Sequence, residues 1–176
     1  MFDTVIIGGV LVDGTGDPSR VADIGILGDK IEAIGDLSGA EASRIIKANG
    51  LTISPGFIDT HVHSDAVLLT KPQHAQSLRQ GITTEILGQD GLSFAPLSSE
   101  NYKDYSLYLS GILGYPPENL DMSSVSAFRS HYKGVGVNTA YLVAHGAVRL
   151  EVAGFHDVPL DKNLLAKAKR LVAQGM

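Results

Sequence analysis

The stretch PGFIDTHVHSDAVLLTKPQHAQSLRQGITTEILG, Pro55–Gly88, decides the fold class of this chain. Two short apolar runs within it, Ile58–His63 and Thr83–Gly88, have the length and composition of β-strands. A helix is predicted between them from Pro72 to Gly81, because proline is favoured in the first helical turn and glycine just past the last. A strand, a helix and a second strand in this order predict a βα unit on a parallel sheet.

The alternation of strand and helix continues after this stretch. Helical patterns occupy 101–113 and 123–134, and Asn138–Gly146 is a third apolar strand. A last amphipathic helix follows Pro159, with Asp161 as its predicted cap. The class is therefore α/β, with three βα units around a parallel sheet. Three units cannot close a barrel, so if the architecture is a barrel we expect this chain to be a fragment of it.

Residues 1–54 have a different pattern. The segment TVIIGGVLVDGTGDPSRVADIGILGDKIEAIG, Thr4–Gly35, consists of short β-branched runs separated by Gly-Gly, Asp-Gly and Gly-Asp pairs. Such pairs favour tight turns between antiparallel strands. We therefore predict a small β-sheet module over residues 1–54 and a separate βα domain over residues 55–176.

Composition excludes several classes of protein. The 176 residues are 44% hydrophobic, enough for a substantial core, and the net charge is -5. No block of basic residues is present, so neither nucleic acid nor an anionic membrane is an expected partner. There are no cysteines, so a metal would have to be held by histidine and carboxylate side chains. The N-terminal apolar run is too short to span a bilayer and lacks a basic leader, so we expect a cytoplasmic protein.

Two histidines, His61 and His63, end the first predicted strand one residue apart. Side chains alternate along a strand, so both imidazoles are expected on one face, about 6.5 to 7 Å apart along the chain. The carboxyl ends of parallel strands carry the chemistry in βα architectures. The pattern therefore favours a divalent metal site at this strand end, although a His-x-His pair is also common without a metal.

Four segments in order resemble one family. PGFIDTHVHSD, Pro55–Asp65, looks like the first-strand metal motif of the amidohydrolase superfamily. GGVLVDGTGDP, Gly8–Pro18, is similar to the β-sandwich opening of its N-acyl-D-amino-acid deacylase, or D-aminoacylase, branch. GITTEILGQDGLSFAP, Gly81–Pro96, and VAHGAVRLEVAG, Val143–Gly154, resemble the same branch. The resemblance runs in register over nearly the whole chain.

This resemblance implies a partial (β/α)8 TIM barrel, comprising its first three βα units, preceded by a small β-sandwich module. It also implies one or two zinc ions and metal-dependent hydrolysis of the amide bond of small-molecule N-acyl-D-amino acids by metal-activated water. His61 and His63 match the family's first-strand ligands. Asp90 stands where many relatives have a ligating cysteine, and it is a ligand candidate because a carboxylate also binds zinc. Alternatively, Gln-Asp-Gly is only a turn there.

Several of the remaining candidates have two interpretations. Asp59 and Asp65 could orient the imidazoles, although Asp65 lies past the strand and could bond backbone only. His145 matches a histidine of the family and could approach the substrate or the metal water, or simply cap the third strand. Arg149 could bind a carboxylate, but a structural ion pair is favoured. Glu85 is interpreted as structural, and surface or cap roles are expected for three other histidines, His74, His131 and His156.

Two alternatives remain open at this stage. A cyclic-amide hydrolase, similar to dihydroorotase or hydantoinase, shares the His-x-His strand, although Gly81–Pro96 and Val143–Gly154 favour the deacylase branch. A non-catalytic fragment would use its exposed barrel edge to pair with the remainder of its own chain, or with another copy in a homo-oligomer. Since the family's later ligands and its proton-shuttling aspartate are absent, we expect the 176-residue chain alone to be inactive.

Overall fold

A computed structural model describes residues 1–176, which form two units, Met1–Pro55 and Gly56–Met176. The smaller unit is a single five-stranded sheet with the strand order β3-β2-β1-β4, and the short β5 pairs beside β1. Its strands are β1 (Phe2–Leu11), β2 (Arg20–Leu27), β3 (Lys30–Gly35), β4 (Ala42–Lys47) and β5 (Thr52–Ile53).

The predicted antiparallel module is confirmed for three of these strands. β1 pairs antiparallel with β2, and β2 with β3, across the glycine-containing turns that the sequence marks. β4 and β5 run parallel to β1, which the turn signals did not predict. Buried Asp23 ties the sheet together, because its carboxylate accepts hydrogen bonds from the backbone N–H groups of Gly8 at 2.8 Å and Leu37 at 2.9 Å.

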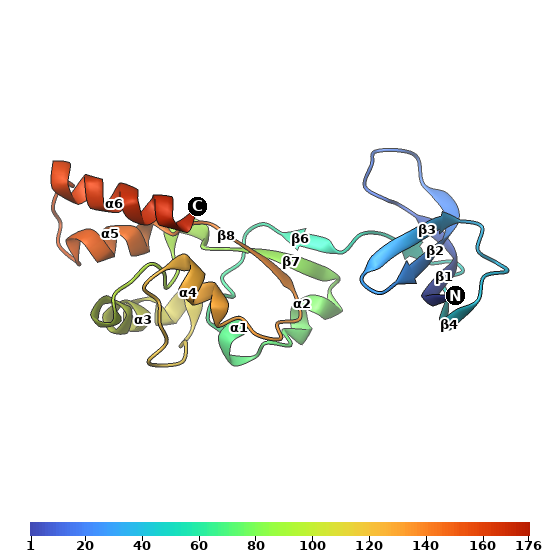
Figure 1. Ribbon diagram of the computed structural model, residues 1–176, viewed down its shortest axis with the longest axis horizontal. Helices are drawn as coiled ribbons and strands as arrows, with labels where there is room; N and C mark the ends of the chain where they lie inside the picture. Colours follow the sequence, from blue (N-terminus) through green and yellow to red (C-terminus); the bar gives the residue numbers. More distant parts are fainter. The chain divides into compact units, whose positions relative to one another are not determined.

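The larger unit contains three parallel strands in the order of the sequence, β6 (Phe57–Asp59), β7 (Ile82–Leu87) and β8 (Asn138–Tyr141). Helices follow each strand (Figure 1). They are α1 (Val67–Thr70), α2 (Ala75–Arg79), α3 (Ser99–Leu113), α4 (Val125–Ser130), α5 (His145–Ala153) and α6 (Lys162–Gly175), with a 3-10 turn, η1 (Gln89–Gly91), after β7. No helix is both long enough and apolar enough to pass through a bilayer.

Several predicted bounds are wrong. The first strand was expected to continue to His63, but β6 ends at Asp59. Beyond that residue the backbone bonds to a side chain and not to the neighbouring strand, because the Asp59 carboxylate accepts from the His61 N–H at 3.1 Å. The third strand ends at Tyr141, and His145 is instead the first residue of α5. The predicted helix after Pro72 is shortened to α2, because the backbone oxygen of Pro72 accepts from Gly136 N–H.

The cap predicted for the last helix is confirmed, and a serine caps α4 as well. Ser124 precedes α4, and its hydroxyl accepts a hydrogen bond from the Ala127 N–H at 3.0 Å. Asp161 precedes α6, and its carboxylate accepts from the N–H groups of Asn163 and Leu164, both at 2.8 Å. Each cap satisfies backbone donors that the first helical turn leaves without partners.

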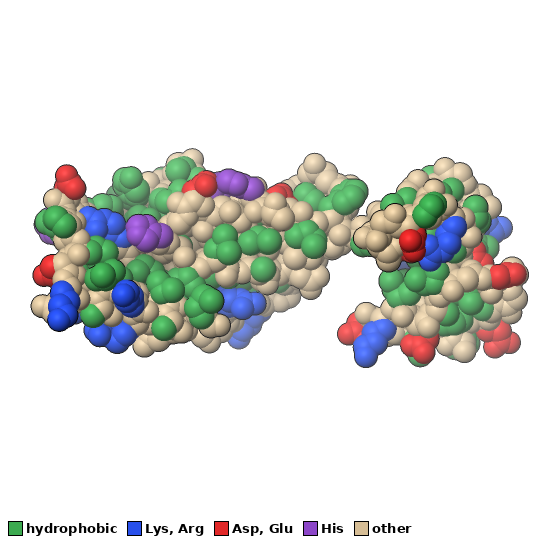
Figure 2. Space-filling view, turned by 90° about the horizontal axis from the view of Figure 1, so that it is seen from above, with side chains coloured by type: hydrophobic (Ala, Val, Ile, Leu, Met, Phe, Trp, Pro, Cys, Tyr) green, Lys and Arg blue, Asp and Glu red, His purple; other side chains and the backbone are tan.

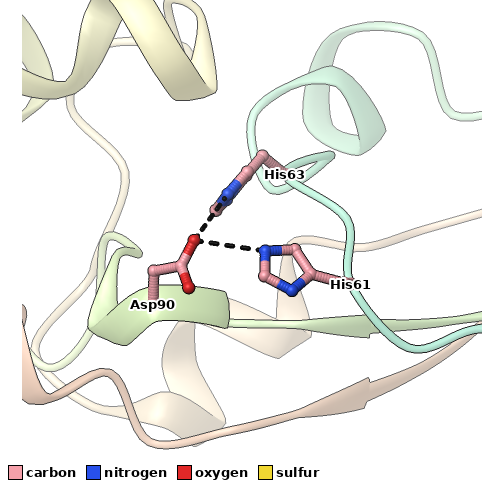
Figure 3. A group of neighbouring side chains, drawn as sticks. All are labelled: His61, His63 and Asp90. Carbon is pink, nitrogen blue, oxygen red and sulfur yellow. Dashed lines mark hydrogen bonds and ion pairs between the residues drawn. The ribbon is translucent and has the colours of Figure 1, made fainter.

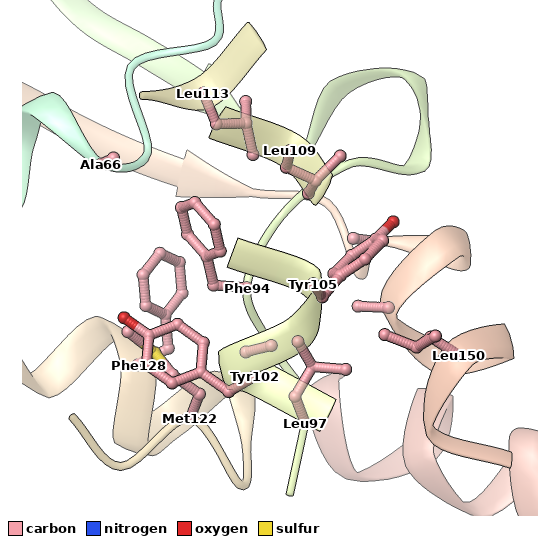
Figure 4. Close-up of a cluster of buried hydrophobic side chains, with 13 residues drawn as sticks. Ala66, Phe94, Leu97, Tyr102, Tyr105, Leu109, Leu113, Met122, Phe128 and Leu150 are labelled. Carbon is pink, nitrogen blue, oxygen red and sulfur yellow. The ribbon is translucent and has the colours of Figure 1, made fainter. Parts of the chain in front are cut away.

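The main core of the larger unit surrounds α3 (Figure 4). Phe94 and Phe128 are completely buried and meet edge to face, with ring centroids 6.5 Å apart. Burial of each phenylalanine contributes about 2 to 3 kcal/mol. Tyr102 and Met122 complete this end of the cluster. The core thus fixes the helices that follow β7, and with them the loop that leaves the carboxyl end of that strand.

Gly88 is predicted to be essential for the turn after β7. It has φ +76°, and a Cβ there would lie 2.2 Å from the backbone oxygen of Leu142. Gly88→Ala is therefore expected to destabilise the larger unit by roughly 2 to 4 kcal/mol, measured by urea-induced unfolding. The control is Gly111→Ala in α3, where a Cβ meets nothing within 4 Å. The free energy of unfolding of this control variant is expected to rise by about 0.5 to 1 kcal/mol. Equal stability of the two variants would contradict this account of Gly88.

Candidate metal centre

His61, His63 and Asp90 lie together at the carboxyl ends of two neighbouring parallel strands. The histidines come from the segment directly after β6, and Asp90 comes from η1 directly after β7 (Figure 3). The three side chains point toward one another. Residues that are 29 positions apart in the sequence are thereby brought together, because β6 and β7 pair in parallel.

The backbone of the histidine segment is held by two side chains. Asp59 accepts from the His61 N–H, as described above, so its carboxylate orients the backbone and not an imidazole. Gln89 reaches across from η1, and its amide nitrogen donates to the backbone oxygens of Thr60 at 2.7 Å and Ile86 at 2.9 Å. Gln89 therefore joins the end of β6 to the end of β7, immediately beside Asp90.

Asp90 lies in the left-handed region, with φ 56° and ψ 15°. Aspartate is among the few non-glycine residues that adopt this conformation readily. Gly88 and Gly91 on either side also have positive φ. The turn that the Gln-Asp-Gly pattern predicts is therefore present, and it directs the Asp90 carboxylate back toward the histidines. The two interpretations of Asp90, as a turn residue and as a ligand candidate, are compatible.

The distances suit a small divalent cation. The Nε2 atoms of His61 and His63 each lie 3.2 Å from the same Asp90 oxygen, Oδ2, and one ligand atom from each residue lies within 4.8 Å of the others. Zinc bonds of about 2.0 to 2.1 Å in tetrahedral geometry separate neighbouring ligand atoms by about 3.3 Å. Two imidazoles and one carboxylate also match the donor types that zinc prefers. The residues present therefore fit the metal.

The same contacts also serve as hydrogen bonds without a metal. A carboxylate oxygen can accept from two neutral imidazoles, each donating through Nε2–H. Exposure shows that the group is reachable, because the side chains of His61 and Asp90 are 63% and 54% exposed. A cation held there would keep open positions for water or a substrate atom. His63 is the more buried of the two histidines, because only 26% of its side chain is exposed.

Two buried polar atoms beside the group have no hydrogen-bond partner, His63 Nδ1 and Asp65 Oδ2. Burial raises the pKa of Asp65 to about 6, against the opposing effects of a hydrogen bond from Ser93 and the charge of nearby His63. The Ser93 hydroxyl donates to the other carboxylate oxygen at 2.5 Å. Of the two interpretations of Asp65, the one in which it bonds backbone only is wrong, because its carboxylate accepts from a side chain. Metal-ligating histidines commonly donate their second ring N–H to a carboxylate.

His145 and Arg149 lie apart from the three ligand atoms. His145 begins α5 and lines a surface hollow of about 350 Å³ together with Leu165 of α6. Its backbone packs near η1, since a Cβ on Gly91 would lie 3.4 Å from the Cβ of His145. The guanidinium of Arg149 donates to the backbone oxygens of His156 and Val158, so the favoured ion pair with a carboxylate is absent.

Sequence reasoning missed a buried pair behind the site. Glu85 of β7 is completely buried, as a structural residue would be, and His74 is only 4% exposed. The Nε2–H of His74 donates to Glu85 at 2.8 Å, so the expected surface role of His74 is wrong. His74 does hold the N-cap position of α2, but its side chain makes no cap hydrogen bond. His131 and His156 have no such partner: His131 bonds the backbone oxygen of Asp121. The only available signal was the acid within an apolar strand, which does not indicate its partner.

Two curated deacylases are similar to most of this chain. The D-aminoacylase of Alcaligenes xylosoxydans xylosoxydans is 36% identical over 162 residues, which cover 86% of this chain and 31% of that protein. The N-acyl-D-glutamate deacylase of the same organism is 41% identical over 149 residues, covering 85% and 30%. The chain is homologous to the N-terminal portion of the N-acyl-D-amino-acid deacylases. It spans about a third of the length of these curated relatives. No protein-family model matches it.

Solved deacylase structures agree with this assignment. A D-aminoacylase studied for its binuclear metal centre matches with a TM-score of 0.84 and 32% identity, covering 99% of this chain and 36% of that one. The N-acyl-D-glutamate deacylase of Bordetella bronchiseptica, complexed with zinc and a phosphonate inhibitor, matches with a TM-score of 0.78 and 30% identity, covering 97% and 35%. The L-hydantoinase of Arthrobacter aurescens is less similar, with a TM-score of 0.51 and 26% identity, covering 80% and 27%.

Proposed function

We propose that this chain supplies the first metal-binding segment of an enzyme that hydrolyses the amide bond of N-acyl-D-amino acids. The observation that carries the proposal is the convergence of His61, His63 and Asp90 on one point at the ends of β6 and β7. The homology to deacylases, one of which was solved with zinc, supports both the reaction class and the metal. The substrate partner is accordingly a small-molecule N-acyl amino acid.

We propose that the two Nε2 atoms and the Asp90 carboxylate hold zinc, as one ion or as part of a two-ion site. Zinc bound there would polarise the amide carbonyl and lower the pKa of water to near neutrality. The protein's own contribution is to present three ligand atoms from two rigid strand ends. The exposure of His61 and Asp90 leaves the open side for substrate.

His145 and Asp65 have supporting roles in this proposal. Asp65 lies buried behind His63, and its unpaired oxygen is suited to accept the second ring N–H of that histidine and so fix the ring orientation. We propose that His145 approaches the substrate, because it begins α5 and packs near η1 without joining the three ligand atoms.

We further propose that residues 55–176 are the first part of a (β/α)8 barrel and that residues 1–54 are the N-terminal part of a β-sandwich domain. Both outer strands of the three-stranded sheet, β6 and β8, have an unpaired edge. Phe57 and Ile58 of β6 are 60% and 61% exposed. Apolar side chains are also exposed on the surface of both units in Figure 2. Further strands of a closed barrel would pair these edges. A cytoplasmic location remains a prediction.

A cyclic-amide hydrolase is the second candidate, because the L-hydantoinase structure shares part of this fold. Its lower similarity, compared with the deacylases, favours linear amides as substrates. In a non-catalytic role the three side chains would form only a hydrogen-bonded group, which does not account for the similarity to deacylases.

The test uses a chimera in which this chain replaces the matching segment of the Alcaligenes D-aminoacylase. We expect the zinc-loaded chimera to release the free amino acid from N-acetyl-D-amino acids, to leave the L-enantiomers intact, and to lose at least about 100-fold in rate when His61 is changed to alanine. A folded, zinc-containing chimera that is no faster than its His61→Ala variant would contradict the proposal. Preferential opening of a cyclic amide would favour the second candidate.

A further inference from the structure

Behind the metal-binding histidines, Glu85 of β7 is buried with both carboxylate oxygens occupied. Oε1 accepts from His74 Nε2–H at 2.8 Å, and Oε2 accepts from the hydroxyl of Ser64. The amide of Gln76 lies 3.2 Å from the other ring nitrogen of His74, which fits a neutral imidazole that donates through Nε2. Ser64 is itself 3% exposed and is the residue directly after His63.

A second serine–carboxylate bond lies beside the first. Asp65, the next residue along, accepts from the Ser93 hydroxyl at 2.5 Å, and Ser93 is completely buried. The backbone oxygen of Ser64 also accepts from the Leu68 N–H at 3.0 Å, at the start of α1. The segment after His63 is therefore tied to β7 through one serine–carboxylate bond and to the loop after β7 through the other.

These contacts are costly in an otherwise apolar layer. A buried carboxylate is disfavoured unless it is fully hydrogen-bonded. An apolar side chain at the same position in β7 would avoid the free-energy cost of removing a charge from water. The neighbouring cluster of Leu68, Leu87 and Val137 is apolar. A polar pair that meets the histidine segment at this point is better explained by a need to fix that segment than by stability alone.

We propose that Glu85 is a positioning residue for the metal centre, acting through the Ser64 hydroxyl to hold His63 in register with Asp90. This inference rests on the proposed metal site and adds a support that the ligands themselves do not reveal. Glu85 does not touch the ligand atoms. It fixes the backbone of Ser64, and hence the position of the neighbouring His63 ring. In that position, Nε2 of His63 lies 3.2 Å from Oδ2 of Asp90.

The test compares two serine-to-alanine variants of the same network. Ser64→Ala removes the bond to the histidine segment. Ser77→Ala is the matched control, because its hydroxyl lies 2.8 Å from His74 Nε2 on α2 and does not contact residues 61–65. Binding of Co²⁺ to the 176-residue chain is followed by its visible absorption. We expect Ser64→Ala to weaken Co²⁺ binding by about tenfold or more, and Ser77→Ala by less than about threefold.

A Ser64→Ala variant that binds Co²⁺ as tightly as the unmodified chain would overturn the inference, and so would an equal loss in Ser77→Ala. If the unmodified chain bound no Co²⁺, the proposed metal site itself would fail. The inference would then be judged by crystal structures of the unmodified chain and Ser64→Ala. We expect the His63 ring to move away from Asp90 in the variant, and an unmoved ring would overturn the positioning role.

Discussion

Zinc binding is expected to be lost when His61 and His63 are both replaced by alanine. The substitution removes two of the three ligand atoms that converge within 4.8 Å, and a single carboxylate does not hold zinc at micromolar concentration. We expect the dissociation constant to rise by at least about 1,000-fold, measured by competition with a chromophoric chelator, because an outer partner alone already contributes 10- to 100-fold.

The control for this prediction replaces His131 and His156, which removes the same number of imidazoles from positions without a metal-ligand partner. This double variant is expected to bind zinc like the unmodified chain. Loss of zinc from both double variants to the same extent would mean that the chain binds zinc nonspecifically through its histidines, and would contradict the site.

Asp90 is expected to show a strong dependence on the chemistry of its side chain. Asp90→Ala removes the oxygen that lies 3.2 Å from both Nε2 atoms and should weaken zinc binding by about 100-fold. Asp90→Cys should retain binding within about tenfold, because a thiolate is also a good zinc ligand and carries a similar charge. Competition with the same chelator measures both variants.

An exposed aspartate on α3, Asp104, provides the control for Asp90. Asp104→Ala removes one negative charge from the larger unit without touching the site, and it should leave zinc binding unchanged. If Asp90→Ala behaved like Asp104→Ala, the Asp90 carboxylate would be only a turn residue, and the ligand set would have to come from elsewhere.

The order of elements was predictable because it depends on local signals. Pro72 and Gly81 mark a helix between two apolar runs, and Ser124 and Asp161 cap helices where the sequence places them. The strand ends were not predictable. β6 stops at Asp59 because Asp59 and Gln89 supply side-chain partners to the following backbone, and such contacts depend on the neighbouring strand.

In the candidate site, too, some residues were predictable from the sequence and others were not. The His-x-His spacing is a local pattern and was enough to nominate His61 and His63. Asp90 was nominated by the resemblance to a family that has a ligand at that position, because the local Gln-Asp-Gly pattern indicates only a turn. The structure brings the three residues into one group. The supporting network could not be found, because Glu85 meets Ser64 and His74 across 21 and 11 positions of sequence. An acid inside an apolar strand predicts burial or function, but periodicity does not identify its partners.

The most direct test of the central claim is anomalous X-ray scattering at the zinc edge from crystals of this chain grown with zinc. The account predicts one strong peak within about 2.0 to 2.2 Å of His61 Nε2, His63 Nε2 and an Asp90 oxygen. A map without a peak at that position, with both rings still hydrogen-bonded to Asp90 at saturating zinc, would contradict it.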